Sequence, residues 1–386
     1  MRILRKNYIY FFLILALLAP GCRKKEPPVT PSGRTVKVGV IGPMSGPSRD
    51  LGQNGLKGIK LSLIMHPYLK NGDKLELVVA DDRNDPRLSV KEFKNMMNTQ
   101  KVSAVLLLSS SASCLAINGI ADGYKTPVLV NLGTHPKIAI NTKYVSQLCF
   151  DDLFQGRVAA LFVHDELLID RVTVFSDPNS FHSSSLANEF VKKFMDTGGE
   201  VTNIIFLKAG SKTDFSKILM KIRKDKPKLL YLPIEPQYII KIIKALRSIG
   251  WFPECMSSDG LLARVVSRYQ NEVHLLDGLY AVDFYSSTII PTPYGEKAIK
   301  KYHEVYGKKG NSFAALGVEG MDILRFAMNR CADPKDKACI NSNLRHTTNF
   351  CGIMGKITIK ENGKALRPLI VNQIRHEKIL GVVKVY

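Results

Sequence analysis

Short apolar runs alternate along this chain with segments of helical periodicity, and this alternation limits the folds available to it. The runs 35–41, 74–80 and 102–108 are rich in β-branched residues, and most of the third is continuously apolar. Between the first two runs, Leu56 and Ile59 begin a series spaced to share one face of a helix. Strands separated by helical segments of about 10–15 residues are typical of βαβ units. We therefore predict an α/β fold with a parallel sheet covered on both faces.

The same alternation occurs again in the second half of the chain. The runs 171–177, 201–207 and 228–234 are separated by helical segments, and Gly198-Gly199 ends the first of these helices. A chain of 386 residues is too long for one typical hydrophobic core. Two sets of strand–helix units therefore predict two doubly wound lobes.

The C-terminal part departs from this rhythm. A long helix is predicted near Ser312–Asn329, and the strand-like runs "GKITI" and "PLIVNQIR" follow it. The segment "KENGKALR" between them contains Asn362-Gly363, a strong hairpin signal. We expect these two runs to form a hairpin, and the chain to cross between the lobes more than once.

The first 22 residues indicate export. Arg2, Arg5 and Lys6 precede the apolar run Tyr8–Leu18, and Ala19-Pro20-Gly21-Cys22 follows it. This is the pattern of a secretory signal, and the run is too short to span a bilayer. A cysteine after small residues resembles a lipobox, so residues 1–22 are interpreted as a lipoprotein signal that leaves Cys22 lipidated. An ordinary signal peptide with a chance cysteine is the alternative. Residues 23–34 are charged and proline-rich and predict a flexible tether.

The net charge of +21 raises the question of a nucleic-acid partner. Export argues against one. The lysines also recur at helical spacings that leave an apolar stripe free, as in "KILMKIRKDKPK". We interpret them as solvated helix faces, favoured beside anionic lipid headgroups, and expect no nucleic-acid partner.

Seven cysteines are too few for a disulfide scaffold in a chain of this length. Cys331 and Cys339 flank the polar loop "ADPKDKA", and an oxidising compartment permits them to pair. Cys351 is a nearby competitor. The remaining cysteines besides Cys22 lie in apolar contexts and are expected to be buried free thiols: Cys114, Cys149 and Cys255.

The segments that follow the predicted strands are rich in small polar residues. They read "GPMSGP", "SSSAS", "LGTHP", "SDPNSF" and "SSDG". Ligands of open parallel sheets bind beyond the carboxyl ends of the strands. These segments offer hydroxyls, backbone groups and two acids, without a cluster of histidines or cysteines. They predict a small-molecule site with no metal and no cofactor.

Nine segments in register give this chain a specific resemblance. They are "VKVGVIGPMSGP", "LGQNGLKGIKL", "KLELVVADDRNDP", "SSSAS", "GTHP", "DLFQGRVAA", "TDFSKILMKIR", "SDGLL" and "ENGKALRP". In order and spacing they resemble the branched-chain amino acid binding proteins, the type I periplasmic binding proteins of ABC importers. The similarity runs from about Val36 to the C-terminus. It implies a solute-binding protein with an ABC permease and ATPase as partners.

The resemblance also implies an architecture of two doubly wound parallel-sheet lobes joined by three crossover strands. The expected crossings lie near Asp151-Asp152, near Asp283-Phe284, and between Gly352 and Lys356. Lobe one would then comprise residues 35–150 plus 284–353, and lobe two residues 151–283 plus 354–386.

By the same resemblance, one end of the site holds the carboxylate of an amino acid. The corresponding residues are Ser111, with Ser109 and Ser110 beside it, and Thr134. Gly133 lets the backbone approach a ligand closely. The alternative for this turn is purely structural, with Thr134 capping a following helix.

The other end would hold the ammonium group. The backbone carbonyl of Leu132 and the carboxylate of Asp259 correspond to its partners, and Phe181 to an aromatic residue that covers the ligand. Leu51 and Ile234 stand where the family often has aromatic residues. The anchor is therefore expected to be kept, while the walls around the side chain differ.

An enzyme is the first alternative to a solute-binding protein. The chain contains no G-x-S-x-G, H-E-x-x-H or P-loop motif, and its eight histidines are scattered. His135 and His182 lie near the predicted cleft, but a lone polar residue in a loop is typically solvated. We therefore expect no enzymatic activity. A ligand sensor, or an envelope protein of the same fold without a transport role, is the alternative to an importer component.

Overall fold

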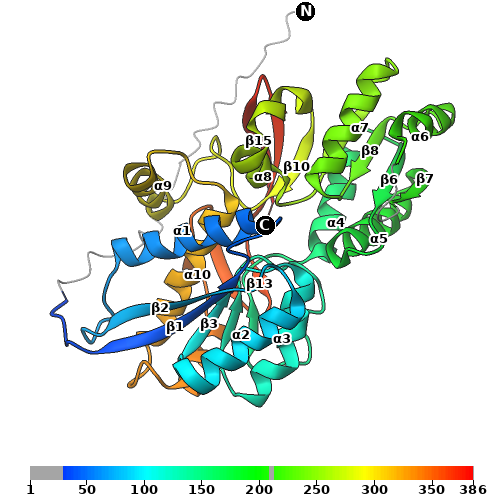
Figure 1. Ribbon diagram of the computed structural model, residues 1–386. Helices are drawn as coiled ribbons and strands as arrows, with labels where there is room; N and C mark the ends of the chain where they lie inside the picture. The colour runs from blue at the N-terminus through cyan, green and yellow to red at the C-terminus, as the bar shows by residue number, and fades with distance from the viewer. Residues whose placement is uncertain (1–28, 208–212, 386) are drawn as a thin grey trace, which may run out of the picture.

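The computed structural model describes residues 29–207 and 213–385, which form two α/β lobes (Figure 1). In this view the first lobe lies at the lower left in blue and cyan, and the green second lobe extends to the right. The predicted signal peptide with Cys22, and residues 23–28 of the predicted tether, lie outside the described residues. Within the described part, no helix combines the length and apolar character needed to cross a membrane.

Lobe one is built on a five-stranded sheet, in the order β2-β1-β3-β4-β5, with every strand parallel to its neighbours. Its strands are β1 (Thr35–Gly42), β2 (Lys74–Asp81), β3 (Ala104–Leu107), β4 (Val128–Val130) and β5 (Val145–Gln147). Its helices are α1 (Arg49–Met65), α2 (Pro86–Asn95), η1 (Met96–Gln100), α3 (Ser111–Gly123), α9 (Pro293–Tyr306), α10 (Ser312–Met328) and α11 (Lys337–Arg345). All residues of β3 and β4 are buried, as expected for strands covered by helices on both faces.

Lobe two contains a seven-stranded sheet in the order β15-β14-β10-β9-β8-β6-β7. The strands from β10 to β7 are parallel, while β14 and β15 are antiparallel to their neighbours. The strands are β6 (Arg171–Ser176), β7 (Glu200–Phe206), β8 (Leu229–Leu232), β9 (Glu254–Ser257), β10 (Tyr280–Asp283), β14 (Leu369–Arg375) and β15 (Lys378–Val385). The helices are α4 (Asp152–Leu161), η2 (Phe162–Glu166), α5 (Phe181–Asp196), α6 (Phe215–Ile222), η3 (Arg223–Asp225), α7 (Pro236–Ser248), α8 (Leu261–Arg268) and η4 (Gln270–Leu276). The parallel sheet of lobe one and the largely parallel sheet of lobe two confirm the predicted fold class.

The C-terminal strands pair differently from the predicted hairpin. The turn at Asn362-Gly363 joins β12 (Lys356–Ile359) to the short β13 (Ala365–Leu366), and β12 also pairs with β11 (Phe350–Cys351). β14 pairs instead with β10 and β15. Six of the seven residues of β14 are buried. A strand this apolar and buried needs a neighbouring strand on each side and cover on both faces, which it finds inside the seven-stranded sheet of lobe two.

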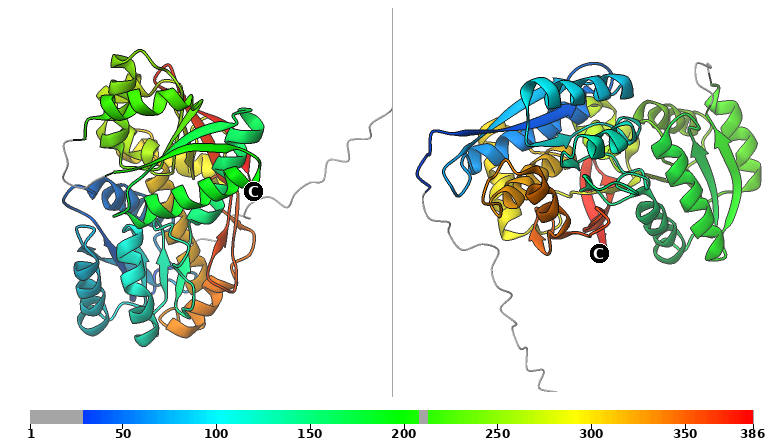
Figure 2. Two further views of the ribbon diagram at one scale, coloured as in Figure 1. Left: turned by 90° about the vertical axis from the view of Figure 1, so that its right-hand side faces the viewer. Right: turned by 90° about the horizontal axis from the view of Figure 1, so that it is seen from below.

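The third crossing therefore lies later in the chain than expected. Residue Lys364 bridges Gln147 at the edge of the lobe-one sheet, and the Gln147 amide donates to the carbonyl of Gly363 at 2.7 Å. The hairpin of β12 and β13 thus belongs to lobe one, and the chain crosses between Leu366 and Leu369 rather than between Gly352 and Lys356. Figure 2 shows this orange segment beside the first lobe.

Side chains from the three crossings pack on one another. The rings of Phe150 and Phe284 stack with centroids 3.9 Å apart, and the guanidinium of Arg367 lies 5.1 Å from the centre of the Phe284 ring. Arg367 Nη2 is 2.9 Å from a carboxylate oxygen of Glu319 on α10, and both side chains are only 1% exposed. The other Glu319 oxygen accepts from the amide of Ile353 at 2.7 Å. The connection between the lobes is thus a packed unit.

The last residues of the predicted tether are attached to lobe one. Ser32 donates its hydroxyl to Asp73 at 2.6 Å, and the Arg34 guanidinium lies 2.9 Å from the same carboxylate. The tether prediction therefore extended too far toward β1, because the acid that holds these residues lies forty residues later in the sequence.

The polar loop between α10 and α11 is closed by a disulfide. Cys331 and Cys339 are joined, with their Cα atoms 5.9 Å apart. Cys114, Cys149 and Cys255 are buried free thiols. This is the pairing favoured by the short polar loop between the two cysteines.

Candidate ligand-binding site

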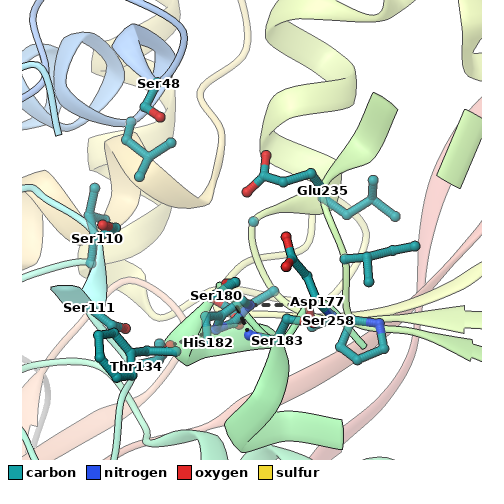
Figure 3. Close-up of a pocket in the computed structure, with 18 of the residues that line it drawn as sticks. Ser48, Ser110, Ser111, Thr134, Asp177, Ser180, His182, Ser183, Glu235 and Ser258 are labelled. Atoms are coloured by element: carbon teal, nitrogen blue, oxygen red, sulfur yellow. Dashed lines mark hydrogen bonds and ion pairs between the residues drawn. The ribbon is translucent and has the colours of Figure 1, made fainter. Parts of the chain in front are cut away.

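A cavity of about 350 Å³ lies between the two lobes. Figure 3 shows hydroxyl-bearing residues of lobe one on its left facing polar residues of lobe two on its right. Most of the residues predicted to bind a ligand line this cavity: Ser110, Ser111, Leu132, Thr134, Phe181 and Asp259. Ser109 and Gly133 do not.

The lobe-one end of the cavity is suited to an anion. Helix α3 begins at Ser111, directly after β3, and Ser110 is its N-cap residue. The Ser110 hydroxyl makes no capping hydrogen bond, so it is available to the cavity. The Ser111 hydroxyl oxygen accepts from the amide of His135 at 3.2 Å, which leaves its proton free to donate. The first N–H groups of a helix have no intrahelical partner and carry partial positive charge, which favours a negative group here.

Ser109 and Gly133 support the site from behind. Ser109 is fully buried and its hydroxyl donates to the carboxylate of Asp82. A Cβ at Gly133 would lie 2.6 Å from the sulfur of Cys114, so glycine is needed for the turn to pack on α3. The Gly133 carbonyl accepts from Gln147 Nε2 at 2.8 Å. The close approach expected of Gly133 is therefore to α3 and not to a ligand.

Thr134 forms a hydrogen bond that joins the lobes. Its hydroxyl oxygen lies 3.0 Å from Nδ1 of His182, the second residue of α5 in lobe two. No helix begins at Thr134, so the alternative in which it caps one does not apply. Its carbonyl accepts from the Asp152 amide at 2.8 Å, which fixes the turn against the start of α4.

His182 is surrounded by acids. Its Nδ1 also lies 3.1 Å from Asp152 Oδ1, and its Nε2 lies 3.2 Å from the Ser258 hydroxyl and 3.6 Å from Asp259 Oδ1. The Asp152 side chain is completely buried and that of Asp259 is 9% exposed. Burial alone would lower the pKa of His182, but the carboxylates of Asp259 and Asp152 outweigh it and raise the pKa from 6.5 to about 9. The imidazole is therefore held as a cation at neutral pH.

Asp259 lines the cavity with its carboxylate already engaged. Gln155 on α4 donates Nε2 to Asp259 Oδ1 at 2.7 Å and accepts from the Asp259 amide at 2.8 Å. Burial raises the pKa of the Asp259 carboxyl, and the neighbouring His182 opposes this only in part. The acid predicted to face an ammonium group thus faces a side chain of the protein itself.

The walls between the two ends are largely apolar. Leu51, Ile234 and Phe313 line the cavity, and the first two occupy positions where aromatic residues were expected in the family. Phe181 is 56% exposed and contacts His135 edge to face, with ring centroids 5.6 Å apart. An exposed aromatic residue at the rim can cover a ligand in the way predicted from the resemblance.

Two cationic residues of the site were missed by the sequence reasoning. His182 was treated as a solvated loop residue, although its place directly after Phe181 and at a helix start was a usable signal. Arg264 of α8 ion-pairs with Glu235 in lobe two and lies 3.5 Å from Asp50 in lobe one. Its partners are far apart in sequence, so no local pattern pointed to it. Among the described residues, no group of three His, Cys, Asp or Glu side chains could hold a metal ion.

Comparison with known proteins assigns this architecture to a protein family. A family model described as "Periplasmic binding protein" matches residues 35–378. The chain belongs to the branched-chain amino acid family of type I periplasmic binding proteins. Proteins of this family and fold are solute-binding proteins of ABC transporters and are not enzymes, and the family is exported to the periplasm.

Proteins similar to this chain in sequence or in fold differ in what they are named for binding or were solved with. An amino acid binding protein of Pseudomonas aeruginosa is 24% identical over 230 residues, covering 59% of this chain and 61% of the relative. A leucine binding protein of Thermotoga maritima superposes with a TM-score of 0.82 at 29% identity, covering 91% of this chain and 98% of that one. A solute binding protein of Rhodopseudomonas palustris, solved with 3,4-dihydroxy benzoic acid, has a TM-score of 0.78 at 17% identity, covering 91% and 97%. This binding protein spans about half to three-fifths of the length of the curated relatives it matches.

Proposed function

We propose that this protein captures a small carboxylic acid, an amino acid or a related solute, and presents it to an ABC permease for import. The observation that carries the proposal is the cavity between the lobes, with free hydroxyls and a helix N-terminus at one end and apolar walls beside them. A carboxylate fits the polar end, because Ser110, Ser111 and Thr134 converge there (Figure 3). A short apolar body fits against Leu51 and Ile234.

The proposed mechanism is capture by closure of the lobes. Lobe one binds the carboxylate, and lobe two closes over the ligand by hinge motion at the three crossings. Thr134 with His182, and Asp50 with Arg264, are contacts between the lobes that closure would strengthen. The permease then recognises the closed form.

Ligand screening tests the proposal directly. Thermal shift of the purified protein against amino acids, amides and short organic acids should yield a ligand, since a compound at 100 times its dissociation constant stabilises a protein by about 2.7 kcal/mol. Small-angle scattering with that ligand should show compaction. Absence of any ligand in such a panel, or no compaction with a verified one, would contradict the proposal.

The import role and the lipid anchor need separate tests. We propose that Cys22 is lipidated and tethers the body to the membrane. Cys22→Ser should move the protein from the membrane fraction to the soluble envelope fraction, whereas a wild-type protein that is already soluble would exclude the anchor. Stimulation of a reconstituted transporter's ATPase activity by the ligand-loaded protein would support import over sensing.

A further inference from the structure

We propose that the cavity selects carboxylic acids that carry no α-amine, because His182 occupies the place that the ammonium group of an amino acid would need. This rests on the proposed function and narrows its ligand class. The expectation from the sequence was an ammonium group held by Asp259. In the structure, the cation that faces Asp259 is part of the protein.

The position of the His182 ring opposes an ammonium group sterically. The imidazole ring spans the space between the Thr134 hydroxyl, 3.0 Å from Nδ1, and Asp259 Oδ1, 3.6 Å from Nε2. The α-amine of an amino acid lies one carbon away from its carboxylate. A ligand carboxylate bound at Thr134 would therefore place the ammonium where the ring lies. An acid without the amine leaves the ring undisturbed.

The charge of the His182 ring also opposes an ammonium group. Nδ1 lies 3.1 Å from a carboxylate oxygen of Asp152, and Nε2 lies 3.6 Å from one of Asp259 and 3.2 Å from the Ser258 hydroxyl, so the two acids favour a proton on both nitrogens. The raised pKa of His182 agrees with that arrangement. A ligand ammonium beside the ring would meet a like charge and would compete for the same two acids, while a ligand carboxylate is attracted.

The other acids of the cavity do not offer the ammonium a substitute. Glu235 ion-pairs with Arg264. Asp177 accepts from the amide of Asn179 at 3.0 Å, and Figure 3 shows it across the cavity from Ser110 and Ser111. An amine adjacent to a carboxylate that is held by those serines is therefore distant from Asp177.

Matched ligand pairs test the inference on the wild-type mature protein. Leucine and isocaproate differ only by the α-amine, as do phenylalanine and hydrocinnamate, and benzoate adds a rigid acid. Calorimetry at pH 7 should show the amine-free member of at least one pair binding about 100-fold more tightly than its amino acid, the scale expected for an ammonium group without its negative partner. Amino acids that bind equally well or better would overturn the inference and leave the proposed function standing. Failure of every acid, with and without an amine, would instead contradict the proposed function.

Substitution of His182 tests whether this residue causes the preference for acids without an amine. His182→Ala should reduce the preference for the amine-free acid by about tenfold or more, because it vacates the ammonium position and frees Asp259. His376→Ala is the control, since His376 lies in the exposed turn between β14 and β15, outside the cavity. An unchanged preference in a folded His182→Ala protein would overturn the inference. His182→Gln, which keeps a hydrogen-bonding side chain without the charge, serves the same purpose if the alanine variant does not fold.

Discussion

At the scale of single residues, the cavity separates side chains that can contact a ligand from side chains that hold those residues in place. Ser111 and Thr134 face the cavity, whereas Ser109 and Gly133, their neighbours in sequence, are directed into the fold. Ser109 and Ser111 thus have different tasks because β3 has ended before the first and α3 begins at the second. The effect on ligand affinity of removing a hydroxyl that lines the cavity should therefore be compared with the effect of removing a hydroxyl on the same helix that does not line it.

Ser111 and Ser113 provide that test. Ser111→Ala should weaken binding of the acid found by screening by on the order of 1–2 kcal/mol, about 5- to 30-fold, because one hydroxyl donor to the carboxylate is lost. Ser113 is fully buried on the same helix and does not line the cavity, so Ser113→Ala should change the affinity by less than about twofold. Calorimetry measures both variants. Equal effects would mean that Ser111 does not contact the ligand.

His182 predicts a dependence of stability on pH. Its pKa in the folded protein is about 9, above its value of 6.5 in the unfolded chain, so its stabilising contribution is complete below pH 6.5 and is lost as the pH rises through 9. The groups that face it are Asp152 from α4, Asp259 before α8, Glu235 before α7, and His135 after β4. The free energy of unfolding of wild type minus that of His182→Gln, measured by denaturant unfolding at each pH, should fall by on the order of 1–2 kcal/mol between pH 6.5 and 9.5.

This difference isolates His182 from other groups that titrate in the same range. Burial raises the pKa of Asp283 to about 7, and that carboxyl is present in both proteins. A difference between wild type and variant that stays constant from pH 6 to pH 9.5 would show that His182 is not held as a cation.

At the scale of elements, the two long helices of lobe one approach each other through glycines. A Cβ at Gly317 of α10 would lie 2.1 Å from the carbonyl oxygen of Gly55 on α1, and a Cβ at Gly58 would lie 2.0 Å from that of Ala314. The colliding atoms belong to the backbone, so neither helix can make room by a rotamer change. The helices can pack at this distance only without side chains at these positions.

Gly317→Ala should therefore destabilise the protein by about 2 kcal/mol or more, although alanine is the better helix former. Gly119 in α3 is the matched control, because a Cβ there meets nothing within 4 Å. Gly119→Ala should be neutral or stabilise by up to about 1 kcal/mol. Thermal unfolding compares the two. A neutral Gly317→Ala would show that α1 and α10 are not in this close contact.

At the scale of the whole molecule, the relation between the lobes depends on the packed crossings. Phe150, Phe284 and Arg367 come from the three crossings, and Glu319 of α10 pairs with Arg367 where both side chains are excluded from water. A buried pair of this kind adds little stability by itself, but loss of one partner leaves the other charge buried alone. The unit therefore constrains the axis about which the lobes can move.

Glu319→Gln should lower the free energy of unfolding by about 3–5 kcal/mol, since it leaves Arg367 without its negative partner. Glu304→Gln removes an exposed acid that pairs with Lys301 three residues away and should cost less than about 1 kcal/mol. Calorimetric melting of both variants measures the difference. Similar losses would mean that the pair at the crossings is open to water in solution.

Much of the architecture was readable in the sequence. The period of the apolar residues determined the alternation of strand and helix, because a buried parallel strand and an amphipathic helix each impose a distinct spacing. The small polar segments after the strands indicated where a ligand would bind, and most of the predicted ligand residues line one cavity. These are local properties, or properties of strand ends that every sheet of this kind brings together.

Only the tertiary structure decided which groups face each other across the cavity and where the chain crosses for the third time. The hairpin after α11 lies in lobe one through its contact with β5, a three-residue strand too short to show a pattern. His182 became the partner of Thr134, Asp152 and Asp259 because α4, α5 and the segment before α8 meet at the cleft. Residues so distant in sequence share no periodicity, and the charge of each depends on neighbours that only the folded chain provides.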